Sequence, residues 1–288
     1  MMLIDSHLHL WDPRGLSYPW LSGLPALNHP HLPEQLADIE GAPDMAIVVQ
    51  ADCLIEQALD EVIWLHQVAE HSPITLAGIV ASAPLEQGEA VRPFLRQLRE
   101  WPLVVGIRRS LQNEPLERFY DAGYRDGVLA VAQEGWVIDL CIRANQLLAA
   151  NDLLNWLFRH CPQARVVLDH MGKPDIAQSH FEEWRQGIDR ITAYPNVYCK
   201  ISGLPTEADW QHWTTEQLAP WILHAIDAFG AERCLFGGDW PVVNLAGGYT
   251  RWRQCVEKTL QLAPLTVQER AGIMAENARR IYSLSSGG

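Results

Sequence analysis

Eight short apolar segments recur along the chain and set the pattern from which its fold can be predicted. They are rich in valine, isoleucine and leucine and alternate only weakly with polar residues, which is typical of strands buried on both faces. The pattern predicts strands at 3–9, 45–51, 75–81, 103–109, 136–142, 165–170, 197–203 and 234–239.

Several of the intervening segments carry apolar residues at three- and four-residue spacing, as on one face of a helix. This spacing predicts helices at 55–70, 146–159, 180–192, 215–229 and 266–282. Thr214 or Thr215 is a candidate N-cap for the fourth of these helices. Pro220 lies inside the same segment and indicates a late start or a kink, because proline lacks the amide that a helix interior uses.

The alternation of strands and helices indicates an α/β fold with a parallel sheet. Eight such units over about 250 residues favour a closed (β/α)₈ TIM barrel. We therefore expect one domain over residues 1–288, since no linker rich in proline, serine or glycine divides the chain. A doubly wound open sheet is the alternative, although the glycine-rich dinucleotide fingerprint is absent after the first strand.

Charge and composition narrow the range of partners. The formal net charge is −13, from 35 acidic and 22 basic residues, which argues against nucleic acid or an acidic membrane surface as a partner. No apolar run approaches the ~20 residues of a membrane span, and the N-terminus does not resemble a secretory signal. The six scattered cysteines form no C-x-x-C pair, so we expect free thiols in a cytoplasmic protein. A homo-oligomer is compatible with this composition, which does not determine the oligomeric state.

Candidate chemistry gathers at the predicted strand ends, where barrels of this kind place their active sites. His7 and His9 end the first strand and share one of its faces, because alternate residues of a strand point the same way. They are candidate metal ligands, or donors to a substrate oxygen. Asp239 ends the last strand and is a candidate general base for a water molecule. The same trio would also suit a single divalent ion.

Further polar residues follow the other strands. His170 precedes a tight turn and is a third candidate catalytic histidine. Arg108 and Lys200 are candidate substrate-binding residues, and a structural ion pair is the alternative for Lys200. Arg109 has the opposite strand parity, which favours a salt bridge behind the barrel. Trp20 and Trp240 are expected near the mouth, where indole faces would pack against a sugar-like ring.

Several segments together carry a resemblance to a known family. They are SHLHLWDP at 6–13, YPWL at 18–21, PALN at 25–28, GIR at 106–108, LDHMGKP at 168–174, YCKISGLPTEADW at 198–210, LFGGDWPV at 235–242 and LAGGY at 245–249. These segments resemble the lactonase branch of the amidohydrolase superfamily, which includes L-fuconolactonases, L-rhamnonolactonases and 2-pyrone-4,6-dicarboxylate lactonases. The resemblance spans nearly the whole chain.

The resemblance implies a hydrolase that opens a sugar-acid lactone. It implies that His7, His9 and His170 surround the lactone carbonyl or one divalent metal, with Asp239 as the base for the attacking water. Arg108 and Lys200 would then fall among the groups that contact the substrate. The bridging lysine or glutamate of binuclear relatives is missing from the middle strands. We therefore expect that no cofactor is strictly required, with one zinc-like ion on His7, His9 and Asp239 as an option.

Three other activities compete with this interpretation. A 2-pyrone-4,6-dicarboxylate lactonase would aim several arginines at its substrate, and Arg108, Arg109 and Arg143 lie near strand ends. A decarboxylase on the same scaffold would need a well-formed metal site. A non-catalytic sugar-acid binding protein is disfavoured, because Asp239 and both histidines of the first strand are present.

Overall fold

Eight parallel strands form one sheet whose hydrogen-bonded order follows the chain, in a computed structural model that describes residues 2–284. The strands are β1 (Ile4–Leu8), β2 (Met45–Val49), β3 (Thr75–Ala81), β4 (Val104–Arg108), β5 (Val137–Leu140), β6 (Arg165–Leu168), β7 (Val197–Ile201) and β8 (Cys234–Phe236). Each lies within a segment that the apolar pattern predicts.

The first and last strands close the sheet into a barrel. The amide of Asp239 donates to the carbonyl of His7 at 2.8 Å, and the amide of His9 donates to the carbonyl of Trp240 at 2.8 Å. Leu8 and Trp240 form a parallel bridge at the same place. An open sheet would leave these two edges unpaired, so the predicted (β/α)₈ barrel is confirmed.

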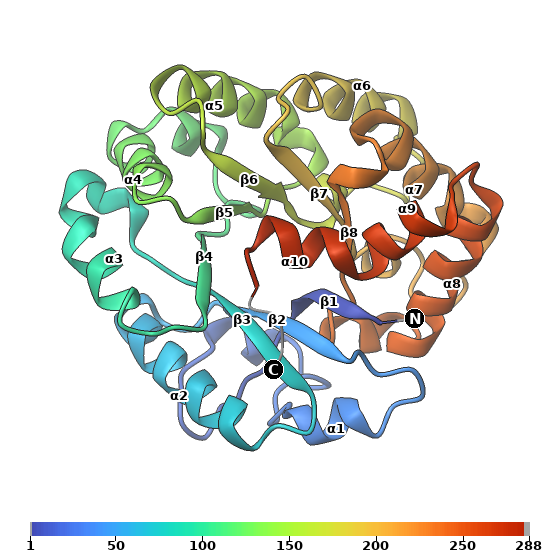
Figure 1. Cartoon of the computed structure of the whole chain (residues 1–288), viewed down its shortest axis with the longest axis horizontal. Coiled ribbons are helices and arrows are strands. Elements are labelled where there is room, and N and C mark those ends of the chain that lie inside the picture. The colour runs from blue at the N-terminus through green and yellow to red at the C-terminus, as the bar shows by residue number, and fades with distance from the viewer. Residues whose placement is uncertain (1, 285–288) are drawn as a thin grey trace.

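A ring of helices surrounds the strands (Figure 1). The helices are α1 (Pro33–Ala37), α2 (Ala58–His71), α3 (Arg92–Leu98), α4 (Ala122–Gln133), α5 (Leu147–His160), α6 (Phe181–Ile191), α7 (Thr215–Phe229), α8 (Tyr249–Leu262), α9 (Val267–Ala271) and α10 (Asn277–Ile281). The last of them, α10, lies across one end of the barrel (Figure 1).

The helices form where apolar spacing and capping agree. In α5, the side chains of Leu147, Leu154 and Leu157 share one face of the helix and are buried. The side chain of Thr214 accepts the Gln217 amide at 3.2 Å and caps α7. Helix α7 begins at Thr215 and continues through Pro220, which excludes the late start, one of the two alternatives predicted for Pro220.

Other sequence-based boundaries need correction. The single helix predicted over 266–282 is α9, a π-helical turn at Gly272–Glu276 and α10. Helices α1, α3, α4 and α8 were not predicted. In α4, the Gly127 backbone touches the 85–91 segment, because a Cβ at this position would overlap the backbone of Leu85. Small and apolar residues lie around much of α4, so its sequence shows no clear three- and four-residue apolar spacing from which a helix could be predicted.

Two apolar cores hold the barrel. The larger lies between the strands and the outer helices. The second lies inside the barrel, where α10 closes it, and is here called the inner core; it includes Ile4, Val49, Val137, Val167 and Tyr282. All six cysteines are free, five of them buried and Cys53 half-buried, as predicted. Within residues 2–284, no helix combines the length and apolar character that crossing a membrane requires.

Candidate active site

A bulge in β1 aims His7, on this strand, and His9, directly after it, into the barrel. Ile4 faces the inner core and Leu8 faces the outer one, which simple alternation does not allow. The pairing with β2 advances three residues along β1, from Asp5 to Leu8, against two along β2. The Asp5 carboxylate stabilises this bulge by accepting the amides of His7 at 2.9 Å and Gly238 at 2.8 Å.

Two glycines let β8 come close enough to β1 for the site to form. A Cβ at Gly237 would lie 2.8 Å from the Cβ of His7. A Cβ at Gly238 would overlap the Tyr249 ring and the Asp5 carboxylate. Asp239 follows them at φ 55°, in the left-handed region that few non-glycine residues adopt. This turn ends β8 at Phe236, earlier than predicted, and directs the Asp239 carboxylate toward β1.

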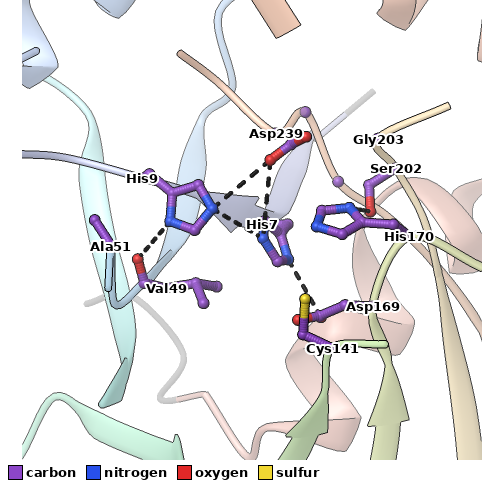
Figure 2. A network of polar contacts seen from close by, with 12 residues as sticks. His7, His9, Val49, Ala51, Cys141, Asp169, His170, Ser202, Gly203 and Asp239 are labelled. Atoms are coloured by element: carbon purple, nitrogen blue, oxygen red, sulfur yellow. Dashed lines mark hydrogen bonds and ion pairs between the residues drawn. The ribbon is translucent and has the colours of Figure 1, made fainter. Parts of the chain in front are cut away.

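His7, His9 and Asp239 point toward one another across the barrel mouth (Figure 2). The Nε2 atoms of the two histidines lie 3.1 Å apart. Asp239 Oδ1 lies 3.7 Å from His9 Nε2 and 4.0 Å from His7 Nε2. The fold thus brings together the three residues that were expected from the sequence to suit one ion.

These three residues fit one divalent ion. His9 Nδ1 lies 2.8 Å from the Val49 carbonyl, which can only accept, so Nδ1 carries the proton and Nε2 carries a lone pair. His7 Nδ1 lies 3.3 Å from Asp169 Oδ1 and 3.2 Å from Lys200 Nζ. When the proton is on Nδ1 and faces Asp169, His7 turns a second lone pair toward the first. A cation between them would satisfy both, and ligand atoms around a tetrahedral zinc ion lie roughly 3.3 Å apart.

His170 lies beside this trio. The β6 strand ends at Leu168, because His170 and Met171 adopt φ values of 53° and 54°. The ring of His170 lies 4.3 Å from that of His7 between centroids, and its Nδ1 lies 2.9 Å from Ser202 Oγ. Gly203 has φ 69° and permits this approach, since a Cβ there would lie 2.5 Å from His170 Nδ1.

Burial sets the protonation of these groups. It raises the pKa of Asp239 to about 7, an effect that Lys173 and Arg108 partly offset. It lowers the pKa of His9 to about 3, and it also lowers the pKa values of His7 and His170 well below the ordinary range. The histidines are therefore neutral near neutral pH, as metal ligands need to be.

A cavity of about 310 Å³ opens above the histidines. It is lined by His9, Trp20, Leu24, Ala51, Asp52, Arg108, Gln112, Asn113, Cys141, Arg143, His170, Lys173, Asp239 and Val242. The long loop between β1 and α1 forms one wall, where Trp20 Nε1 donates to the Ala51 carbonyl at 2.8 Å. Arg108 and Trp20 are thus among the residues that line the cavity.

Two predicted substrate-binding residues lie elsewhere. Lys200 is fully buried below the histidines, 3.0 Å from Asp169 Oδ1 and paired with Asp139. These contacts are those expected for a structural ion pair, which was the alternative to substrate binding for Lys200. Trp240 is also buried and packs edge-on against His31. Neither is among the residues that line the cavity.

Other residues around the site were not singled out from the sequence. Asp5 and Asp139 occupy strand interiors, where a carboxylate among apolar residues is itself a signal of a paired charge. Asp52, Gln112 and Asn113 lie on loops that carry no motif. Arg109 pairs with Glu86 and Glu114 at 2.6 Å each, as its strand parity indicated.

Comparison with known proteins agrees with this architecture. The family model described as amidohydrolase matches residues 4–284. The chain is 31% identical to an L-fucono-1,5-lactonase of Burkholderia multivorans, over 98% of this chain and 96% of that protein. It is 30% identical to an L-fucono-1,5-lactonase of Burkholderia ambifaria, over 98% of this chain and 95% of that protein.

A solved structure extends the likeness to three dimensions. It is an amidohydrolase from Burkholderia multivorans with bound zinc. The TM-score is 0.87 at 30% sequence identity, and the match covers 99% of this chain and 100% of that one. A match of this extent, together with the family model over nearly the whole barrel, shows that the chain belongs to the amidohydrolase family.

Proposed function

We propose that this protein hydrolyses the lactone of a polyhydroxylated sugar acid. The observation that carries the proposal is a carboxylate, Asp239, whose Oδ1 faces two neutral histidines at the floor of a small polar cavity. The named activity of its L-fucono-1,5-lactonase relatives supports the same substrate class. A volume near 310 Å³ is at the lower end of small-molecule sites and suits a single ring.

The pairing of charges in the cavity favours a neutral lactone over a dicarboxylate. Arg108 Nη1 lies 3.4 Å from Asp169. Arg143 and Lys173 both pair with Glu207, at 3.4 Å and 3.8 Å. Because each of these cations already faces a carboxylate, a substrate with two negative charges would have to displace an existing partner. Asp52, Gln112 and Asn113 instead offer acceptors and donors that suit hydroxyl groups.

Asp239 acts as the general base in the proposed reaction. Its Oδ1 faces the histidines, which leaves Oδ2 to accept a proton from water. The hydroxide oxygen bonds to the lactone carbonyl carbon and forms a tetrahedral oxyanion. The bond from carbon to the ring oxygen then breaks, and that oxygen takes the proton that Asp239 received from water. The product is one open-chain hydroxy acid.

The histidines stabilise charge as it develops. His170 Nδ1 can accept from Ser202 Oγ, so that its Nε2–H is free to donate to the oxyanion. His7, His9 and Asp239 would hold a divalent ion of the zinc type, which when bound supplies polarisation of the carbonyl and a more acidic water.

The experiment is a pH-indicator assay of the purified protein against two panels of lactones. One contains sugar-acid lactones with six- and five-membered rings, and the other contains 2-pyrone-4,6-dicarboxylate. Each is run after chelator treatment and after zinc is restored. We expect acid release from sugar lactones and restoration of full activity by zinc.

Two results would contradict the proposal. Turnover of the pyrone dicarboxylate alone would assign the site to the rival class. Absence of acid release from every lactone, with zinc bound and the protein folded, would remove the lactonase assignment. A Glu207→Gln variant sharpens the comparison, because it frees Arg143 and Lys173 and should improve binding of anionic lactones relative to neutral ones.

A further inference from the structure

A buried network of polar groups runs from the closed end of the barrel to the histidines. Tyr282 follows α10, and its hydroxyl donates to Asp139 Oδ1 at 2.6 Å. Asp139 Oδ2 accepts from Lys200 Nζ. Lys200 Nζ in turn lies 3.0 Å from Asp169 Oδ1 and 3.2 Å from His7 Nδ1. Every one of these side chains is at most 2% exposed.

The network is balanced in charge and buried. Asp139 and Asp169 are matched by Lys200 and by Arg108, which lies 3.4 Å from Asp169. In a buried network of this kind, loss of one partner leaves a charge or a donor unsatisfied, and the remaining groups shift to compensate. A change at one end can therefore reach the other.

Asp169 is where the network meets the active site. Its Oδ1 is shared between Lys200 Nζ and His7 Nδ1, at 3.0 Å and 3.3 Å. Lys200 is also close enough to donate to His7 Nδ1, which would turn that nitrogen into an acceptor. The position of Lys200 thus decides how firmly Asp169 holds the His7 proton on Nδ1, and so which nitrogen of His7 presents a lone pair to Asp239.

We infer that Tyr282 is a positioning residue for His7, acting from the opposite end of the barrel through Asp139, Lys200 and Asp169. The Tyr282 hydroxyl fixes one oxygen of Asp139, and the other oxygen holds Lys200 in place. Removal of the hydroxyl leaves Asp139 with one donor fewer. Asp139 then no longer holds Lys200 at the same place, and the distance between Lys200 Nζ and Asp169 Oδ1 changes. The readout in activity rests on the proposed function, whereas the position of the His7 proton does not.

The test compares Tyr282→Phe with Tyr198→Phe. Tyr198 lies two residues before Lys200 on β7 and packs on the same inner core, and among the described residues its hydroxyl is outside this network. We expect Tyr282→Phe to lower kcat on the order of 10-fold with KM unchanged, as for partners that orient a ligating histidine. Tyr198→Phe should retain wild-type kcat, and both should keep the wild-type circular dichroism spectrum.

A spectroscopic readout tests the inference without a substrate. In protein with ¹⁵N-labelled histidine rings, Tyr282→Phe should move the Nδ1 signal of His7. The signal of His9 should stay, because its Nδ1 faces the backbone carbonyl of Val49. An unchanged His7 signal in Tyr282→Phe overturns the inference, as does an equal shift in Tyr198→Phe.

A double-mutant cycle decides whether Tyr282 acts through Asp139. If it does, adding Tyr282→Phe to Asp139→Asn produces little further loss of kcat and little further shift of the His7 signal. Additive effects would contradict the proposed route. Should the wild-type protein hydrolyse no lactone, the proposed function fails, and the His7 signals still decide the role of Tyr282.

Discussion

Asp239 joins three roles at one residue. Its left-handed backbone ends β8, its amide closes the barrel on His7, and its carboxylate faces His7 and His9. Burial places its pKa at about 7, within reach of proton exchange near neutral pH. Replacement of Asp239 by asparagine tests the proposed base, because asparagine keeps the shape of the side chain and removes the carboxylate.

Asp239→Asn should lower kcat by a factor of about 10²–10⁴, the usual contribution of a positioned general base, and leave the fold intact. The measurement is lactone turnover together with the thermal unfolding midpoint. Asp227→Asn, at an exposed position on α7 outside the catalytic cavity, is the matched control and should behave as the wild type. Near wild-type turnover in Asp239→Asn would show that another group activates the water.

His9 gives a prediction about metal. Because its Nε2 lone pair is fixed by the Val49 carbonyl, His9→Ala should remove one of three ligands and lower the zinc content from about one ion per chain to near zero after dialysis. Elemental analysis of the dialysed proteins measures this. His29→Ala changes an exposed histidine and should retain zinc. Equal zinc in the two variants would place the ion elsewhere.

At the scale of elements, the bulge in β1 and the two glycines of the β8 turn form one unit. Asp5 accepts an amide from each strand, so the turn of β8 and the bulge of β1 stabilise each other. The loop between β1 and α1 builds on this unit with its own small core, which includes Trp11, Tyr18 and Leu21. The mouth of the barrel is therefore held by side chains as well as by strand pairing.

Gly238→Ala should break this unit. Its Cβ would overlap the Asp5 carboxylate and the Tyr249 ring, both of them buried, so we expect a loss of about 1–3 kcal/mol in the free energy of unfolding. Urea unfolding measures the loss. Gly23→Ala is the control, since no atom lies within 4 Å of the Cβ it would add. Equal stabilities for the two variants would mean that the turn adjusts without strain.

The sequence predicted these elements well where the signal was local. Apolar runs located all eight strands, and strand parity placed Arg109 in a salt bridge. The bulge of β1 depends on Gly238, which lies more than two hundred positions away, so no local pattern reveals it. Burial of Lys200 likewise depends on its ion pair with Asp139. From the sequence alone, a lysine at a strand end is equally consistent with a substrate contact and with a structural ion pair. The pattern of apolar and polar positions does not show which charged residues far apart in the sequence pair in the fold.

At the scale of the whole molecule, the barrel buries several carboxyl groups. Burial raises the pKa values of Asp5 and Asp139 to about 6 and that of Glu61, on α2, to about 7. Glu61 Oε1 accepts the amide of Ala51 at 3.0 Å, just beneath the mouth. A carboxyl group whose pKa is higher in the folded state stabilises the fold at low pH, and this contribution is lost as the pH rises through the folded pKa.

Glu61→Gln should therefore flatten the pH dependence of stability. Between pH 5 and pH 8, the free energy of unfolding of the wild type should fall by about 2–3 kcal/mol more than that of the variant, which cannot ionise at this position. Urea unfolding at several pH values measures the difference. Glu70→Gln, exposed on the same helix, should follow the wild type. Parallel curves for wild type and Glu61→Gln would refute the prediction.

The seam between β1 and β8, where the first and last strands of the barrel meet, forms only after the eighth strand is in place. Activity at the candidate site therefore requires both strands. Two of the candidate metal ligands, His7 and His9, lie near the start of the chain, and the third, Asp239, follows β8. During synthesis, a nascent chain carries the histidines early but lacks their carboxylate until the eighth strand emerges. Metal retention and turnover would then appear together and late, so that activity reports closure of the barrel rather than the mere presence of folded helices and strands.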